Sequence, residues 1–201
     1  IASIEGGMQT LIDALVAELS DMENVEIRLE QEALSAQTVA QEYGIAAKSV
    51  IWAAPGARES FTESALSVFA IGYREEQVAN VKVGYGTLIP DRQLPISGIL
   101  HESDLHHSQR CPEGHRLFRL MVPHNRWDKD EQKVVQCAEK LLAKDPVLFV
   151  NIGERKIPSY PAGYMADLKR LNDEFSYAGW SISGVSITHV VDEAERFAEL
   201  F

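Results

Sequence analysis

The sequence predicts an α+β fold in which helices pack on a mixed, largely antiparallel sheet. Apolar residues at helical spacing mark some segments, whereas strict alternation or short continuous apolar runs mark others as strands. The two kinds of segment alternate irregularly along the 201 residues, without a repeat or a long linker. Such an irregular order favours a mixed sheet with helices packed on it.

The first quarter of the chain contains one predicted helix and three predicted strands. Apolar residues at positions 8, 11, 12, 15, 16 and 19 follow the spacing of an amphipathic helix. Residues 25–30 alternate apolar and charged side chains, which indicates a half-buried strand, and a second strand is expected at 37–43. The continuous apolar run at 49–54, closed by Pro55, is typical of a fully buried strand.

The middle of the chain is expected to contain more strands than helices. Residues 57–71 are predicted to form one or two short helices, and residues 77–85 alternate as a strand does. Further strands are expected at 94–100 and 116–122, separated by a loop rich in histidine.

A predicted helix over 128–144 opens the C-terminal part. Asp128 is its expected N-cap, and Glu131, three residues later, completes a capping box. The remaining expected elements are, in order, a short buried strand at 147–152, a helix near 164–175, a strand at 177–181, a turn at Gly184 and a final helix to Phe201.

The composition is that of an acidic globular chain. It has 19 Lys and Arg against 30 Asp and Glu, which gives a net charge of -11. Because an acidic surface repels phosphate backbones, nucleic acid is not expected as a partner, and contact with anionic lipid is disfavoured. Cys111 and Cys137 are too few for a disulfide framework, so a reducing cytoplasm is the expected compartment. No apolar run reaches the roughly 20 residues that a membrane-spanning helix needs.

Three stretches, read together, resemble one flavoprotein superfamily. The first combines Gly6-Gly7-Met8 and its helix with the run at 49–55. The second is 102–118, which contains Cys-Pro-Glu-Gly-His. The third joins 157–163 to 178–187, which reads Ala-Gly-Trp-Ser-Ile-Ser-Gly-Val-Ser-Ile. In order and spacing they resemble the C-terminal half of FAD-dependent amine-oxidase-type flavoproteins, the group that contains phytoene desaturases, protoporphyrinogen oxidases and monoamine oxidases.

The resemblance implies a division of the chain into three parts. Residues 1–56 contribute a helix and strands to the FAD-domain side, 57–156 form the substrate-binding domain, and 157–201 supply the closing strand-turn-helix of the FAD domain. The family's pyrophosphate fingerprint, G-x-G-x-x-G after a strand, does not occur in these 201 residues. In the family it lies nearer the N-terminus, and this chain begins with Ile1 rather than Met. We therefore expect a fragment whose partner is the N-terminal Rossmann half of the same protein.

The turn and helix near the C-terminus form the predicted cofactor site. Gly184 allows a tight turn, and a helix that begins near Val185 presents free N–H groups and a positive dipole end. A reduced flavin is anionic at its N1/O2 edge, so such a helix start would stabilise it, although the pattern also fits an ordinary helix start after a glycine turn. The resemblance implies that the isoalloxazine is lined by Gly179, Trp180, Gly184, Val185, Ser186 and Ile187, and that the adenine lies near Ala33.

Several positions depart from the family pattern. Trp180 stands where an acidic or amide residue is usual, and Ser186 replaces the second glycine of a Gly-Val-Gly motif. The indole of Trp180 would either stack on the flavin or fill the space of its ring. Gly153 and Tyr164 stand where the protoporphyrinogen-oxidase branch has tryptophan and histidine, which argues against a porphyrinogen as substrate.

The activity that the resemblance implies is that of an FAD-dependent oxidoreductase. It would dehydrogenate or desaturate a small apolar organic substrate, with oxygen or a quinone as acceptor. We place substrate contacts at His106, His107 and Tyr160. No catalytic acid or base is assigned, because in hydride transfer to a flavin the cofactor supplies the chemistry. Whether an apolar substrate also brings membrane contact stays open.

Two other functions are open at this point. A non-catalytic binding or interaction module with the substrate-domain fold would account for the missing fingerprint and for Trp180. A metal-binding domain would use the five histidines between 101 and 124 together with Cys111. Their spacing matches no common zinc motif, so no metal ligand is assigned.

Overall fold

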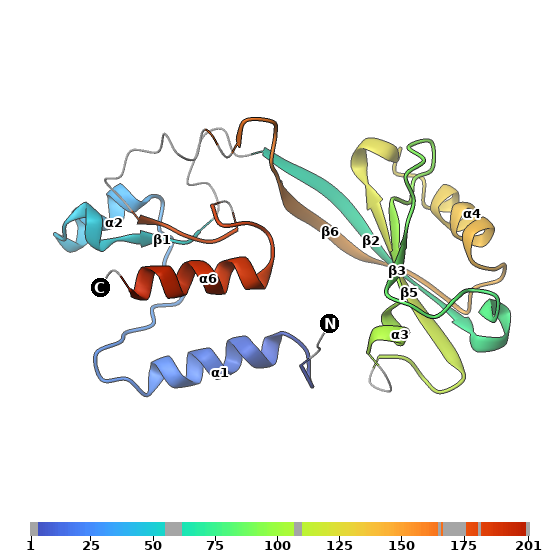
Figure 1. The fold of residues 1–201 in the computed structure, drawn as a ribbon, viewed down its shortest axis with the longest axis horizontal. Helices are drawn as coiled ribbons and strands as arrows, with labels where there is room; N and C mark the ends of the chain where they lie inside the picture. The colour runs from blue at the N-terminus through green and yellow to red at the C-terminus, as the bar shows by residue number, and fades with distance from the viewer. Residues whose placement is uncertain are drawn as a thin grey trace. The chain divides into compact units, whose positions relative to one another are not determined.

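The computed structural model shows a chain that folds as two compact units (Figure 1). The described residues are 4–54, 62–106, 110–164, 166, 176–180 and 182–199. The first unit comprises Ile1–Glu26 and Ser64–Ile157, and the second comprises Ile27–Glu63 and Pro158–Phe201. The three-part division that the resemblance implies stays a prediction.

A five-stranded sheet forms the centre of the first unit. Its strands, in spatial order, are β3 (Gly86–Leu88), β4 (Gly98–Leu100), β5 (His115–Pro123), β2 (Thr62–Arg74) and β6 (Leu148–Ser159). β2 and β5 pair antiparallel over nine residues, from Leu66 opposite Pro123 to Arg74 opposite His115. β4 pairs antiparallel with both of its neighbours. The predicted α+β class with a largely antiparallel sheet is therefore confirmed.

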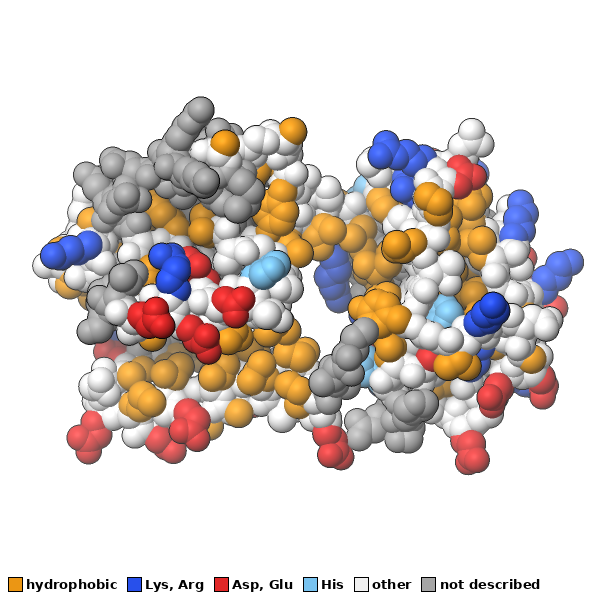
Figure 2. Space-filling view, viewed as in Figure 1, with side chains coloured by type: hydrophobic (Ala, Val, Ile, Leu, Met, Phe, Trp, Pro, Cys, Tyr) orange, Lys and Arg blue, Asp and Glu red, His pale blue; other side chains and the backbone are white. Residues whose placement is uncertain are grey.

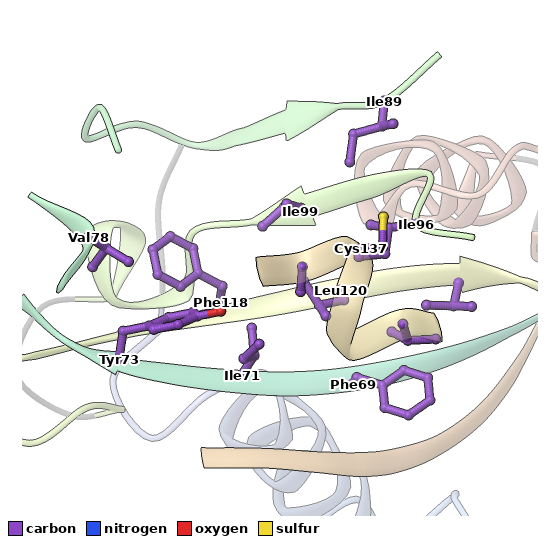
Figure 3. Packing of buried hydrophobic residues seen from close by; sticks show 13 residues of the cluster. Phe69, Ile71, Tyr73, Val78, Ile89, Ile96, Ile99, Phe118, Leu120 and Cys137 are labelled. Carbon is purple, nitrogen blue, oxygen red and sulfur yellow. The ribbon is translucent and has the colours of Figure 1, made fainter. Parts of the chain in front are cut away.

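One face of this sheet carries the core of the first unit (Figure 3). Alternate residues of β2 and β5 point to the same side because strand side chains have a period of two, and α4 (Glu131–Leu141) contributes to the same cluster. The residues that these three elements contribute to the cluster are Phe69, Ile71, Tyr73, Phe118, Leu120, Val122, Val134, Cys137 and Ala138. We call this side of the sheet the covered face.

The helix α4 is confirmed, but it begins later than expected. Asp130, not Asp128, is the N-cap, and its carboxylate accepts a hydrogen bond from the Gln132 amide at 2.9 Å. Asp128 instead accepts a hydrogen bond from the Asp130 amide and pairs with Lys133. The expected capping box between Asp128 and Glu131 is thus wrong.

Two predictions for the first unit are wrong in kind. Of the predicted helical segment 57–71, residues 57–61 lie outside the described part, and the rest belongs to β2, whose side chains are buried on both sides of the sheet around Val68 and Phe69. Residues 77–85 form no strand. Residues 77 and 78 end the 3₁₀ helix η2 (Glu75–Val78), and the others follow it. The carbonyl groups of Val78 and Val81 accept hydrogen bonds from the side chain of Arg116 instead of from a neighbouring strand.

Other elements of the first unit agree more closely with expectation. α1 (Gln9–Ser20) confirms the first helix, although none of its residues is buried. The strands expected at 94–100 and 116–122 correspond to β4 and β5, and the one expected at 147–152 continues to Ser159 as β6. Two short elements complete the unit, α3 (Glu102–Leu105) after β4 and the 3₁₀ helix η3 (His124–Arg126) after β5.

The second unit is built around a short parallel strand pair. β1 (Ile51–Trp52) pairs with β7 (Ser176–Tyr177), and α6 (Ile187–Ala198) follows. The run at 49–54 is thus only partly a strand, and Ile51 is exposed instead of buried, because the 3₁₀ helix η1 (Ala47–Ser49) occupies its start. Of the strand expected at 177–181, Tyr177 belongs to β7, residues 178–180 form no strand, and residue 181 lies outside the described residues. Most of the helix expected near 164–175 lies outside the described residues.

The segment expected as a second strand is a helix. α2 (Ala36–Tyr43) begins at the N-cap Ser35, whose Oγ accepts a hydrogen bond from the Thr38 amide at 3.1 Å. It ends at Gly44, which has a φ of 61° and so adopts the left-handed C-cap conformation. Apolar residues at 36, 39, 40 and 43 have the helical spacing that indicates this helix.

Residues 25–30 do not form a strand either. Glu30 has a φ of 59°, which interrupts an extended backbone. Arg28 donates a hydrogen bond to the hydroxyl of Tyr43 at 2.7 Å, so this segment is held by α2 and not by a strand ladder.

Within the described ranges, no helix of the chain combines the length and apolarity that a bilayer crossing needs.

Candidate functional site

The predicted cofactor turn follows directly on the parallel strand pair of the second unit. The Ser176 amide donates to the Val50 carbonyl at 3.3 Å, and the Ala178 amide donates to the Trp52 carbonyl at 2.9 Å. The turn therefore leaves the carboxyl ends of β1 and β7, which is the edge at which open sheets with parallel strands bind ligands.

Gly179 fixes the first bend of this turn. Its φ is 89°, and a Cβ built on it would lie 3.1 Å from the carbonyl oxygen of Ala53, so the backbone passes too close for a larger residue. Its own carbonyl accepts hydrogen bonds from the Ile182 amide at 3.0 Å and from the Ser183 amide and hydroxyl at 2.9 and 2.7 Å. Three hydrogen bonds to one carbonyl thus close the turn.

The start of α6 is capped and exposed. Ser186 is the N-cap, and its Oγ accepts a hydrogen bond from the His189 amide at 3.1 Å. The amides of Ile187 and Thr188 come before that of His189 in the first turn of α6, and they have no hydrogen-bond partner within the helix. The side chains of Val185 and Ile187 are 58% and 53% exposed, so the second unit does not bury this helix start. Figure 2 shows acidic and basic side chains gathered further along α6.

Gly184 connects the turn to α6 and has a φ of 118°, a conformation that favours glycine. The imidazole of His189 lies against its Cα, where a larger residue would clash. The predicted flavin residues Gly179, Trp180, Gly184, Val185, Ser186 and Ile187 thus occupy one continuous turn and helix start. Ala33 belongs to the same unit and lies in an exposed segment before the Ser35 cap.

Tyr160 is joined to this turn. It follows β6, and its hydroxyl donates a hydrogen bond to the carbonyl oxygen of Trp180. The ring centroid of Tyr160 lies 5.0 Å from that of the buried Tyr164, and burial, then the neighbouring Tyr164, raises the pKa of Tyr160. Of the other expected substrate contacts, His106 ends α3 in the first unit, and His107 lies outside the described residues.

A second candidate surface lies on the side of the large sheet opposite the covered face. The side chains of β6 that point there are Leu148, Val150 and Ile152, each between 42% and 44% exposed. Gly72 of β2 leaves room for Leu148, because a Cβ on Gly72 would lie 3.2 Å from that of Leu148. The other residues on this side are Ala70 on β2, Leu117, Arg119 and Met121 on β5, and Leu100 on β4, which are partly exposed, and Leu66 and Val68 on β2, which are buried. We call it the open face.

One charged residue interrupts the open face. Arg119 is paired with Ala70 on one side and Leu100 on the other, and Leu117 and Met121 flank it along the strand. Its Nη2 lies 3.1 Å from Oε1 of Glu102, whose side chain is only 6% exposed. Sequence reasoning did not single out Arg119, although a lone arginine at an apolar strand position was the available signal.

A separate ionic network lies on the covered face. Arg116 donates to both carboxylate oxygens of Asp104, at 3.2 and 2.7 Å, and His101 lies 3.3 Å from the same carboxylate. Burial alone would raise the pKa of Asp104, but the hydrogen bonds from Arg116, the Gly84 amide and His101 hold it below its ordinary value. His101 is therefore part of a buried structural network.

The histidines do not assemble a metal centre in the part of the chain that the structure describes. No three His, Cys, Asp or Glu side chains there are grouped as a metal ion would require. His124 lies 3.1 Å from the hydroxyl of Ser67, away from the Asp104 network of His101. The metal-binding alternative therefore gains no support from these residues.

The fold is similar to that of two solved structures. One is described as "Putative protoporphyrinogen oxidase" from Exiguobacterium sp. 255-15, with a TM-score of 0.65 and 19% identity over 98% of this chain. The other is a reduced UDP-galactopyranose mutase, with a TM-score of 0.51 and 14% identity over 71% of this chain. The likeness is one of fold. No family model and no curated protein matches the sequence.

The matched part is only a portion of each of those proteins. This chain spans 51% of the Exiguobacterium protein and 34% of the mutase. The Exiguobacterium protein is described as a member of the group that the sequence motifs resemble, so the motifs and the fold agree.

Proposed function

We propose that this chain is the substrate-domain half, with the closing strand-turn-helix, of an FAD-dependent oxidoreductase that dehydrogenates or desaturates an apolar substrate. The observation that supports it most is the start of α6, which is preceded by the glycine turn, capped by Ser186 and left exposed. A helix start of this kind attracts negative charge, and a reduced flavin carries such charge at its N1/O2 edge.

The residues of the turn fit a planar ring with an anionic edge. The amides of Ile187 and Thr188 would donate to that edge, because Ser186 already satisfies the His189 amide. Gly179 and Gly184 keep the backbone free of Cβ atoms on the approach to the helix. When bound, the flavin supplies the hydride-accepting chemistry, and the chain orients it and stabilises the charge of its reduced form.

The open face of the large sheet suits an apolar substrate. Val150 and Ile152 on β6 present apolar side chains that neighbouring residues of the chain leave half-exposed. Contiguous exposed apolar surface on a sheet commonly marks a ligand or partner site. This surface would exclude water from a substrate and fix its orientation by shape.

Flavin reconstitution tests the proposal. This chain and the full-length gene product would each be incubated with FAD, desalted and examined for absorbance at about 450 nm, a general property of oxidised flavin. Colour in either form supports the proposal. Colourless protein in both forms would favour a non-catalytic binding module, the alternative that Trp180 supports if its indole fills the space of the ring.

A pair of variants tests the role of the helix start. Ile187→Pro removes one first-turn amide without breaking the helix, because proline is tolerated at the first helical position and Ser186 already has the extended conformation that precedes a proline. Ile187→Leu keeps the amide and serves as the control. We expect Ile187→Pro to weaken binding of reduced flavin about three- to tenfold more than that of oxidised flavin. If Ile187→Pro and Ile187→Leu bound reduced flavin with equal affinity, the role assigned to the start of α6 would be contradicted.

A further inference from the structure

Arg119 is an arginine held in the middle of an apolar surface. Four apolar residues surround it within the sheet, and 35% of its side chain is exposed. A charged group at such a position is unfavourable unless it is paired, so its retention there needs a reason.

The pairing of Arg119 leaves positive charge in excess. Glu102 is its partner, through Oε1 at 3.1 Å, but the other oxygen of the same carboxylate binds Arg110 at 3.2 Å. Two guanidinium groups therefore share one carboxylate, and this cluster carries a formal charge of about +1. In a chain whose net charge is -11, it is a local exception.

The guanidinium of Arg119 also keeps donor capacity. Arginine has five N–H donors in a planar fork, and its contact with Glu102 uses Nη2. Within the described residues, Arg119 makes no second ion pair. By contrast, Arg116 on the other side of β5 binds both oxygens of Asp104 and the carbonyl of Val78.

From this arrangement we propose that Arg119 anchors an anionic oxygen group of the ligand that lies on the open face. The ligand would be an apolar molecule that bears one carboxylate or a similar acid group. The apolar part would contact Val150 and Ile152, and the acid group would bind the free edge of the guanidinium, with Glu102 holding that guanidinium in place. This proposal rests on the proposed function, because it specifies the substrate class for the same chain.

Arginine suits this role better than lysine does. Its planar fork binds carboxylate in a bidentate manner, and it is less strongly hydrated than an ammonium group, so it can act at the edge of an apolar surface. Because Glu102 is buried and bound from both sides, it fixes the position of the cation without cancelling the excess charge.

Binding of a matched pair of fluorescent lipophiles tests the proposal. cis-Parinaric acid and cis-parinaryl alcohol share one polyene chain and differ only in the acid group. Both would be titrated into the full chain at pH 8 and followed by fluorescence. We expect the acid to bind about tenfold or more tightly than the alcohol, in line with charge-assisted hydrogen bonds.

Two substitutions locate the preference. Arg119→Gln should abolish the preference for the acid, because it weakens binding of the acid about tenfold and leaves binding of the alcohol unchanged. Arg110→Gln makes the same change of charge and removes the other partner of Glu102, but lies off the sheet, so it should retain the preference. Arg119→Lys should retain part of the preference. Unchanged alcohol binding by Arg119→Gln shows that its loss of the preference is not a failure to fold.

Three results would overturn the proposal. The first is equal affinity of the unaltered chain for the acid and the alcohol. The second is an equal fall in affinity for both ligands in Arg119→Gln. The third is a loss of the preference in Arg110→Gln that is as large as in Arg119→Gln. Flavin absorbance is measured separately. Yellow protein without an acid preference contradicts only the Arg119 anchor, whereas an acid preference in colourless protein contradicts only the proposed function.

Discussion

Two arginines on the same strand show how differently the two faces of the large sheet use charge. Arg116 and Arg119 both lie on β5, and each pairs with a carboxylate of α3. Arg116 points to the covered face, where it binds both oxygens of Asp104 and two backbone carbonyls. Arg119 points to the open face and makes one contact with Glu102.

The difference separates a structural cation from one that is available to a ligand. The Arg116 guanidinium donates four hydrogen bonds, and it also lies 5.1 Å from the ring centroid of Phe118. It therefore ties η2 and α3 to the sheet, and only 8% of its side chain is exposed. Arg119 contacts Glu102 through Nη2 and its side chain is 35% exposed, so its loss should affect binding more than folding.

The largest expected effect is the cost of losing the structural arginine. Arg116→Gln should lower the free energy of unfolding of the first unit by about 3 to 5 kcal/mol, because Asp104 would stay buried without its partner. Arg119→Gln should cost about 1 kcal/mol or less, as expected for a partly exposed pair. With Trp52 and Trp180 replaced by Phe, urea unfolding followed by the fluorescence of Trp127 reports on this unit alone. Similar costs for both substitutions would mean that the two faces do not differ in this way.

A leucine on each face gives the apolar version of the same comparison. Leu120 is fully buried on the covered face, whereas Leu148 on the open face is 44% exposed. Leu120→Ala should cost about 2 to 5 kcal/mol, because it removes buried atoms and leaves a cavity. Leu148→Ala should cost no more than about 1.5 kcal/mol, since much of its side chain already contacts water. The same Trp127 unfolding curve measures both, and a Leu148→Ala cost as high as that of Leu120→Ala would show that the open face is covered in solution.

How far the sequence predicts the fold depends on whether local pattern or distant partners decide each element. α1, α4 and α6 have long apolar stripes and were all expected. α2 has only 8 residues, and its short pattern also predicts a strand. The helix signals lie at its ends, where Ser35 is the N-cap and Gly44 the C-cap. Residues 25–30 alternate apolar and charged side chains as a strand does. Such a segment forms a strand only where a neighbouring strand is available to hydrogen-bond with it.

The candidate site divides in the same manner. The glycine turn and the cap of α6 depend on residues close in sequence, so their local form was predictable from Gly184 and Ser186. Arg119 and Glu102 are far apart in sequence, and only the register of β4 against β5 brings them together. No local signal reveals that register, because either face of a strand with apolar residues on both sides can be the buried one.

The pH dependence of stability should distinguish the buried Asp104 from an exposed carboxylate. Its pKa in the folded chain is lowered, so its pairing contributes stability that is present above the unfolded value of about 3.9 and is lost as pH falls through the lower folded value. Unfolding free energies of the wild type and Asp104→Asn should therefore differ at pH 6 and converge as the pH falls below about 4.

Asp128→Asn provides the control for that experiment. The pKa of Asp128 is also lowered, chiefly by its hydrogen bond with Lys133, but the pair is exposed to solvent and screened by salt. Its pH dependence should disappear at about 1 M salt, whereas that of Asp104 should persist. If salt removed both equally, the Asp104 network would be as open to solvent as the surface pair.

The smallest expected effect concerns helix starts, where the same distinction between engaged and available donors applies. Ser35→Ala and Ser186→Ala each remove one side-chain cap, so each should destabilise its helix by about 1 kcal/mol. Hydrogen exchange of the Thr38 and His189 amides measures the loss at each site. The two should respond differently to added sulfate, because the exposed start of α6 offers amides to an anion, whereas the first residue of α2, Ala36, is buried. Sulfate should therefore restore protection to the His189 amide in Ser186→Ala and leave the Thr38 amide of Ser35→Ala unchanged. An equal response of both helices would contradict an anion-binding role that is specific to α6.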